Sequence, residues 1–334
     1  MKKVNLAVVG VTGMVGRTFL KVLEEKNLPI ENFYVFASAR SAGSKIEFQG
    51  KEYVVEELTE TSFDRGIDVA LFSAGGSTSE KFAPIAAKKG CVVIDNSSAW
   101  RMDPEVPLVV PEVNPEDIAM NKGIIANPNC STIQAMVALK PLNDKYKIKR
   151  VVYSTYQAVS GAGRGGWLDL ENGLKGEPPK KFPHPIAGNC LPHIDVFLEN
   201  GYTKEEMKMV NETRKILHSP DMRITATAVR VPVFHSHSES INVEFEKPYE
   251  LSELTEVLKN SPGVILKNNC ADNEYPMAIE AAGTDEVYIG RIRRDESVES
   301  GVNLWVVADN IRKGAASNAV QIAEYMINNN MFDK

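Results

Sequence analysis

The chain has 334 residues, which at roughly 150 residues per domain predicts two domains, each able to bury its own core. Hydrophobic residues make up 43% of it and charged residues 25%, a balance typical of a globular protein rather than a disordered or fibrous one. With 38 Lys and Arg against 44 Asp and Glu, the formal charge is −6, so the overall field opposes binding to nucleic acid or an anionic membrane. An anionic ligand must therefore be held by a few local cations.

The first half of the chain alternates β-type and helical segments. The β-type runs lie at 4–9, 33–37, 69–72 and 91–94, and segments of helical periodicity lie at 14–23 and 79–88. Such alternation predicts a parallel, doubly wound α/β sheet. The opening run is too short for a signal peptide and far short of the about 20 apolar residues of a membrane span, so we expect neither.

The second half has a different pattern, which predicts an α+β domain. A helix is expected at 131–142, a strand at 150–158, and a loop in the proline-rich region 176–193. Two longer runs, 223–234 and 240–246, alternate as antiparallel strands do. A final helix is expected at 315–326, where its apolar face could return to cover the first sheet.

Three glycines separate the first strand from the first helix. Gly10, Gly13 and Gly16 form a G-x-x-G-x-x-G turn, which allows backbone N–H groups and the helix N-terminus to approach a pyrophosphate. The motif differs from the commoner G-x-G-x-x-G, and a tight turn without a ligand is the alternative interpretation.

The end of the second strand indicates which dinucleotide would bind. Ser38, Arg40 and Ser41 follow it, and this segment has no carboxylate for a ribose 2′-hydroxyl. A guanidinium and two hydroxyls suit a 2′-phosphate, which favours NADP. The alternative is an exposed loop with a chance arginine.

Cys130 differs from the other cysteines because it lies in a polar turn that leads into the 131–142 helix. A thiolate there is stabilised by unsatisfied N–H groups and the helix dipole, which makes Cys130 a candidate nucleophile. Cys91, Cys190 and Cys270 are expected to be small buried hydrophobic residues. Four scattered cysteines without a C-x-x-C pair argue against a zinc site or a disulfide framework and predict a reducing, cytoplasmic location.

Several longer motifs resemble the bacterial-type aspartate-β-semialdehyde dehydrogenases, in the order in which that family has them, over nearly the whole chain. They are FSAGG at 72–76, DNSSAWR at 95–101, VVPEVN at 109–114, PNCST at 128–132, STYQAVSGAG at 154–163 and GAASNAVQIAE at 314–324.

The resemblance implies a Rossmann-type NADP-binding domain at 1–129 and 315–334. Between its two parts, residues 130–314 would form a catalytic, substrate-binding and dimerisation domain with a mixed, largely antiparallel sheet, in a homodimer. The implied reaction is the reversible NADPH-dependent reductive dephosphorylation of L-4-aspartyl phosphate to L-aspartate 4-semialdehyde. It proceeds through an acyl thioester and serves lysine, diaminopimelate, methionine and threonine biosynthesis.

The residues suit this chemistry. Cys130 would attack the acyl carbon, with Asn129 and the N–H groups of the helix start stabilising the oxyanion. A histidine is the expected acid–base group, and His235 and His237 are the candidates outside loops and helix ends. In the family a substrate arginine precedes the catalytic histidine by seven positions, which selects Arg230 with His237. An H-x-H metal site is the alternative for these histidines, but no third ligand can be placed.

The resemblance also implies the groups that bind the substrate. Arg230 would hold its carboxylate, Glu212 its ammonium group, and Arg101 with Lys215 its phosphate, while Gln157 would orient the acyl group. Glu212 and Lys215 are three apart on a predicted helix, where without the resemblance they would form a solvated ion pair. The cofactor is expected to contact Gly10, Thr12, Gly13, Met14, Val15, Ser38, Arg40, Ser41, Ser73, Gly75, Ser160, Gly161 and Asn318.

Two other functions compete with this one. N-acetyl-γ-glutamyl-phosphate reductase performs the same chemistry, but its nucleophile lies in a Gly-Cys-Tyr-Pro-type motif and its acetylated substrate offers no ammonium group to Glu212. An NADP-sensing Rossmann protein would need neither a thiol at a helix N-terminus nor the pairing of Arg230 with His237.

Overall fold

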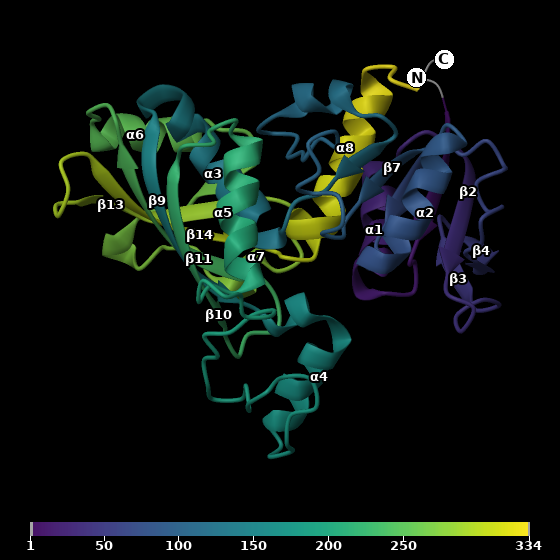
Figure 1. Ribbon diagram of the computed structural model, residues 1–334. Coiled ribbons are helices and arrows are strands. Elements are labelled where there is room, and N and C mark those ends of the chain that lie inside the picture. Colours follow the sequence, from purple (N-terminus) through teal and green to yellow (C-terminus); the bar gives the residue numbers. More distant parts are fainter. Residues whose placement is uncertain (1–2, 333–334) are drawn as a thin grey trace. The chain divides into compact units, whose positions relative to one another are not determined.

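The computed structural model describes residues 3–332, which fall into two compact units (Figure 1). One unit contains the residues up to Asn129 together with those from Ala315 onward, and the other runs from Cys130 to Gly314. Each unit is built around its own six-stranded sheet. Among the described residues, no helix is both long and apolar enough to cross a membrane.

The sheet of the first unit is parallel throughout, in the order β5-β2-β1-β6-β7-β8. Its strands are β1 (Val4–Val9), β2 (Ile30–Ala37), β5 (Glu56–Glu57), β6 (Val69–Phe72), β7 (Val92–Asp95) and β8 (Ile124–Ala126). A small antiparallel hairpin, β3 (Lys45–Phe48) with β4 (Lys51–Val54), lies in the chain between β2 and β5. Because the order runs outward from β1 in both directions, the predicted doubly wound topology is confirmed.

Helices α1 (Met14–Lys26) and α8 (Ser317–Asn328) share the main core of this unit with the sheet. Phe19 and Leu23 of α1 and Ile322 and Met326 of α8 are buried against Val8 and neighbouring strand residues. Helix α2 (Gly76–Lys88) contacts β7 and β8. The final helix begins slightly later than expected, because residues Arg312–Ala316 form a π-helical turn before it.

The glycine turn between β1 and α1 is tightly packed. Gly10 has φ +85°, and a Cβ there would overlap the carbonyl of Ser73, while a Cβ at Gly16 would overlap the carbonyl of Gly10. Both glycines are therefore required by the fold, whether or not a ligand binds. Gly13 is different: a Cβ at this N-cap of α1 would meet only ordinary contact, at 3.4 Å from the Gly10 oxygen. Packing therefore does not require glycine at this position.

The sheet of the second unit is mixed, in the order β10-β9-β11-β14-β13-β12. Its strands are β9 (Ile148–Gln157), β10 (Arg223–Arg230), β11 (His237–Phe245), β12 (Val264–Leu266), β13 (Val287–Asp295) and β14 (Gly301–Ala308). Three of its five pairings are antiparallel, as predicted. The expectation that the 223–234 run is antiparallel was wrong, since β10 ends at Arg230 and runs parallel to β9. Apolar and polar residues alternate in β10 because one face of the strand is more buried than the other. The long crossover connection through α4 and α5 makes β10 parallel to β9.

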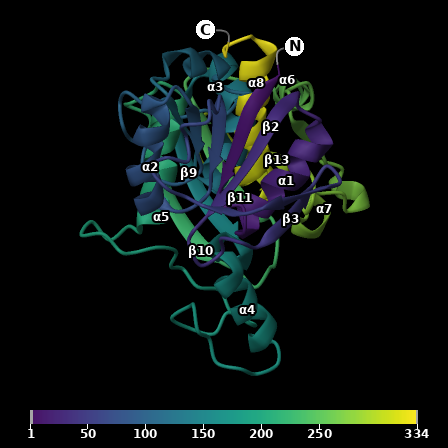
Figure 2. The same cartoon turned by 90° about the vertical axis from the view of Figure 1, so that its right-hand side faces the viewer.

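Helices α3 (Cys130–Tyr146), α5 (Lys204–Ile216) and α6 (Leu251–Lys259) pack against this sheet. Helix α4 (Gly163–Gly173) and the proline-rich segment after it lie beyond the end of β10 in both views (Figures 1 and 2). Asp169 of α4 ties that segment down by accepting hydrogen bonds from three successive backbone N–H groups, at residues 180–182. The remaining helix of this unit is the short α7 (Ala278–Ala281).

Candidate active site

Cys130 is the first residue of α3 and is partly buried. The 17-residue helix α3 begins at Cys130, so this residue lies at the helix N-terminus, beside the backbone N–H groups of the first turn. A Cβ at Gly314 would lie 2.9 Å from Cys130 Cβ, so the backbone at Gly314 packs directly against the cysteine.

The other cysteines correct one expectation. Cys91 is buried as predicted, but Cys190 and Cys270 are exposed. Both lie in segments outside the two main cores, and Cys270 accepts a hydrogen bond from Arg291 Nη1 at 3.5 Å. Loops that connect elements run over the surface, so residue type alone is a poor guide to burial there.

His237 and Arg230 both contact the backbone of Ala158. His237 begins β11 and is 0% exposed, and its Nδ1 accepts a hydrogen bond from the backbone N–H of Ala158 at 3.0 Å. Arg230 ends β10, and its Nη1 donates to the carbonyl of the same Ala158 at 2.7 Å. Burial lowers the pKa of His237 to about 3, with the charge of Arg230 acting in the same direction and Glu205 opposing it.

Two buried nitrogens of this pair have no hydrogen-bond partner within residues 3–332. They are His237 Nε2 and Arg230 Nε. A Cβ at Gly161 would lie 3.3 Å from His237 Nε2 and 2.9 Å from Arg230 Nη1, so glycine keeps the space beside both groups clear. The charge of Cys130 also acts on Arg230 and raises its pKa, against the larger lowering by burial. Thiol, imidazole and guanidinium are therefore brought together as predicted from the sequence.

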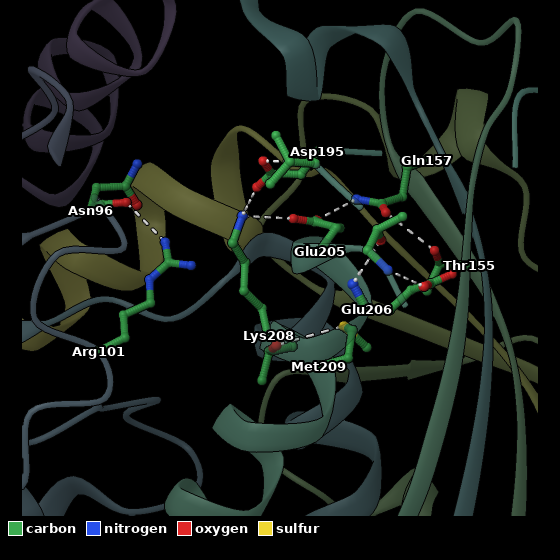
Figure 3. Close-up of polar contacts among 12 residues, drawn as sticks. Asn96, Arg101, Thr155, Gln157, Asp195, Glu205, Glu206, Lys208 and Met209 are labelled. Atoms are coloured by element: carbon green, nitrogen blue, oxygen red, sulfur yellow. Dashed lines mark hydrogen bonds and ion pairs between the residues drawn. The ribbon is translucent and has the colours of Figure 1, made fainter. Parts of the chain in front are cut away.

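A chain of polar contacts extends from Gln157 into α5 (Figure 3). Gln157 Nε2 donates to Glu205 Oε1 at 3.1 Å, and Glu205 Oε2 is 3.0 Å from Lys208 Nζ, which also contacts Asp195 at 2.8 Å. Burial alone would lower the pKa of Lys208, but Glu205 and Asp195 outweigh it and raise that pKa. The site thus contains a buried carboxylate and a cation that the sequence interpretation missed.

Glu212 and Lys215 lie farther along the same helix. Glu212 is 1% exposed and seven residues beyond Glu205, which is about two turns or roughly 10 Å along the axis. The carboxylate bonded to Gln157 is that of Glu205, not that of Glu212. Its neighbour Glu206 is used structurally, since it completes a capping box with Thr203 and accepts from the N–H of Ala228.

Glu239 is a second buried acid that was not anticipated. It lies two residues after His237 on the same face of β11 and is 0% exposed. Burial raises the pKa of this carboxyl well above its usual range, although the hydroxyl of Ser131 acts in the opposite direction. Neither oxygen of this buried carboxyl has a hydrogen-bond partner among the described residues.

In the first unit, three predicted residues have defined surroundings. Arg101 is 7% exposed and donates from Nε to the carbonyl of Asn127 and from Nη2 to that of Asn96. Asn318 is buried in α8, where its amide donates to the carbonyl of Val109 and to Asn127 Oδ1. Asn129 is also buried.

The predicted cofactor residues occur in both units. In the first unit, Thr12, Met14 and Val15 belong to the glycine turn and the start of α1, and Ser38, Arg40 and Ser41 form a turn after β2 in which Arg40 is exposed. Ser73 follows β6, and Gly75, with φ +88°, precedes α2. In the second unit, Ser160 Oγ accepts from Asn310 Nδ2 at 3.0 Å, one residue before Gly161.

Comparison with known proteins agrees with this geometry. Residues 5–121 match the family model described as semialdehyde dehydrogenase, NAD binding domain, and residues 139–313 match that of its dimerisation domain. An aspartate-semialdehyde dehydrogenase from Aquifex aeolicus is 62% identical over 332 residues, which cover 97% of this chain and 98% of that protein. The chain belongs to the aspartate-semialdehyde dehydrogenase family. It is thus an oxidoreductase whose first unit is a nicotinamide-dinucleotide-binding domain.

Other members of the family are similar along their whole length. The Bacillus subtilis aspartate-semialdehyde dehydrogenase is 47% identical, with 96% of each chain covered. The crystal structure of aspartate semialdehyde dehydrogenase II from Vibrio cholerae is 48% identical and superimposes with a TM-score of 0.94, covering 98% of this chain and 99% of that one. A second structure of that protein, with the same scores, is described as complexed with ASA.

The H-x-H alternative gains no support from the arrangement. Within residues 3–332, no group of three or more His, Cys, Asp or Glu side chains is placed to hold a metal ion. His235 is half-buried and packs edge-on against Trp167, whereas His237 faces Ala158.

The raised pKa of Glu239 makes the stability of the protein depend on pH. Above the usual glutamate pKa of about 4.3, the unfolded chain loses this proton while the folded state keeps it, so the free energy of unfolding falls by about 1.4 kcal/mol per pH unit. Glu239→Gln removes this dependence. We expect the variant to gain stability over the parent steadily between about pH 5 and about pH 7, as measured by urea unfolding.

The dependence on urea concentration should be the same for both proteins, which checks that the same transition is compared. A stability difference that does not change with pH would mean that Glu239 is ionised in the folded protein.

Proposed function

We propose that the chain catalyses the reversible, NADP-dependent, phosphorylating oxidation of L-aspartate 4-semialdehyde to L-4-aspartyl phosphate through a thioester on Cys130. The observation that carries the proposal is the cluster at the start of α3. A thiol at a helix N-terminus interacts with a buried Arg230, which contacts the same residue, Ala158, as His237 does. The Vibrio cholerae relative complexed with ASA supports the choice of substrate.

The charges of the cluster match those of the substrate. Arg230, with its unpaired buried Nε, is suited to the α-carboxylate, because a guanidinium binds carboxylates in a fork geometry. We propose Glu205 in place of Glu212 for the α-ammonium group, since Glu205 is the carboxylate joined to Gln157. Because Lys208 pairs with Glu205, we propose Lys208 in place of Lys215 as a phosphate ligand. Arg101 remains the other proposed phosphate ligand, as the family pattern implies.

The side chains would act in a fixed sequence. The Cys130 thiol gives its proton to His237 and adds to the aldehyde carbon as the thiolate. The resulting oxyanion is stabilised by the N–H groups at the start of α3, with Asn129 beside them. Gln157 orients the acyl group of the thioester that remains after hydride loss. Phosphate then attacks the thioester and releases the thiolate. The nicotinamide dinucleotide accepts or donates the hydride when it is bound.

NADP is proposed over NAD because of the turn after β2. Arg40 is exposed there, and Ser38 and Ser41 supply hydroxyl donors to a 2′-phosphate. The glycine turn and the N-terminus of α1 would hold the pyrophosphate, with Gly13 as the position of closest approach.

The biological setting follows from the chemistry. We propose a homodimer formed by the second unit, which matches the dimerisation domain of the family. In the reductive direction, the product L-aspartate 4-semialdehyde would enter the biosynthesis of lysine, methionine and threonine. A reducing, cytoplasmic compartment would keep Cys130 in the thiol form, and none of the four cysteines, which all lie within the described residues, is in a disulfide.

Replacing the nucleophile tests the reaction directly. Cys130→Ser should lower kcat for phosphate-dependent NADP reduction by aspartate semialdehyde by more than roughly 10³-fold, because the hydroxyl cannot form the thioester efficiently. Binding of NADP, followed by fluorescence titration, should stay within a few-fold of the parent. The matched control is Cys270→Ser, an exposed thiol whose loss should leave kcat unchanged. Faster oxidation of N-acetylglutamate semialdehyde than of aspartate semialdehyde by the parent enzyme would contradict the proposed substrate.

The two glutamates of α5 can be separated by the same isosteric change. Glu205→Gln should raise KM for aspartate semialdehyde roughly 10- to 100-fold, since a hydrogen bond between charged groups contributes about 1.5 to 3 kcal/mol. Glu212→Gln should leave KM close to that of the parent, because KM does not depend on how much enzyme is folded. If Glu212→Gln raised KM and Glu205→Gln did not, Glu212 would be the residue that binds the ammonium group.

The cofactor preference depends on Arg40. Arg40→Ala should raise KM for NADP by about tenfold or more and change KM for NAD little, because only NADP carries the 2′-phosphate. Lys45→Ala, on the neighbouring hairpin, serves as the control for a general loss of positive charge. Equal increases in KM for NADP and NAD would mean that Arg40 does not bind the 2′-phosphate.

A further inference from the structure

Asp195 reaches the proposed site from the loop between α4 and α5 (Figure 3). Before Asp195, this loop is anchored at Leu191, which exchanges two backbone hydrogen bonds with Arg230, at 2.9 and 2.8 Å. After Asp195, it is anchored at Val196, whose carbonyl accepts from the N–H of Lys204, the first residue of α5. Asp195 is therefore held between the end of β10 and the start of α5.

The two oxygens of the Asp195 carboxylate have different partners. The residue has φ +68°, in the left-handed region that Asp and Asn adopt more readily than most other residues. Oδ1 accepts a hydrogen bond from the N–H of Val196 at 2.9 Å, and Oδ2 lies 2.8 Å from Lys208 Nζ. Asparagine would keep the contact with Val196 but would place an NH₂ group opposite the ammonium group of Lys208. The contact with Lys208 is therefore the one that requires an acid.

Lys208 is shared by two carboxylates. Its side chain is 19% exposed, and its Nζ lies 3.0 Å from Glu205 Oε2 in addition to its contact with Asp195. Burial lowers the pKa of Lys208, but the charge of Glu205 and the hydrogen bond to Asp195 more than reverse this effect. An ammonium group has three donors, so two are used here and one is left for a further acceptor, such as the proposed phosphate.

The proposed substrate would bring a second ammonium group to Glu205. The charge of Arg230 also acts on Glu205, but we propose Arg230 for the substrate carboxylate. If Glu205 alone neutralised Lys208, one buried carboxylate would face two ammonium groups. Asp195 supplies a second carboxylate, so that each ammonium group has one of its own. Such pairing matters because a charge removed from water is costly unless an opposite charge compensates it.

We propose that Asp195 is a positioning residue that pairs with Lys208 and thereby leaves the charge of Glu205 to the α-ammonium group of the substrate. The proposal rests on the function proposed above and specifies how its ammonium site is kept available. In this role Asp195 acts through Lys208 and does not touch the substrate. The competing explanation is a structural one, in which Asp195 only fixes the loop through its hydrogen bond with Val196.

Asp195→Asn separates these explanations, because it removes the charge and keeps the acceptor for Val196. In steady-state kinetics of the full-length enzyme, KM for aspartate semialdehyde should rise by about three- to tenfold, between the effects of an exposed ion pair and of a charged hydrogen bond. KM for phosphate should not rise, since a negative charge is removed from beside Lys208. A parallel rise in both KM values, or an unchanged KM for aspartate semialdehyde, would overturn the proposal.

A matched control is available in the same loop. Glu199 is exposed, and Glu199→Gln removes the same charge from that loop. This variant should leave KM for aspartate semialdehyde within about twofold of the parent. An increase equal to that of Asp195→Asn would mean that the net charge of the loop, rather than the contact with Lys208, is responsible.

A double-mutant cycle tests whether Asp195 acts through Lys208. In a Lys208→Met background the cation that Asp195 pairs with is gone, so adding Asp195→Asn should change KM for aspartate semialdehyde by less than about twofold. The same increase as in the parent background would contradict the proposal. These outcomes are distinct from a failure of the proposed function, which would appear as a preference of the parent enzyme for a different aldehyde.

Discussion

The backbone of Ala158 is the constraint that positions two side chains of the proposed site. Its N–H fixes His237 and its carbonyl fixes Arg230. It follows the last residue of β9, Gln157, which pairs with Arg230 in the parallel neighbour β10, while β11 begins at His237 on the other side of β9. Three functional side chains thus come from the same end of three adjacent strands, and their positions are as rigid as the sheet.

Burial of this cluster has a desolvation cost, and it also strengthens the electrostatic interactions within the cluster. Charges removed from water must be paired or neutralised, and the site shows both solutions. Lys208 is paired with Glu205, whereas burial lowers the pKa of His237 and raises that of Glu239, which favours the neutral form of both groups. The low local dielectric also strengthens the hydrogen bonds within the cluster.

In the first unit, the corresponding constraint is the close approach of α1 to β1. Gly10 and Gly16 are required by packing alone, so two of the three glycines of the motif say nothing about a ligand. Gly13 differs from them, because a Cβ would fit there. The close packing of this turn thus accounts for two of the three glycines and leaves the third to the proposed pyrophosphate contact.

From sequence alone, the strand and helix periods determined the parallel sheet of the first unit, and residue context selected Cys130, because a polar turn before a helix is a local feature. Tertiary packing decided the rest. Glu205 with Lys208 and Glu212 with Lys215 have the same spacing on one face of α5, and only the approach of Gln157 distinguishes them. The hydrogen bond from the backbone N–H of Ala158 to His237, 79 residues away, likewise depends on the fold, because β9 and β11 become neighbours only in the sheet.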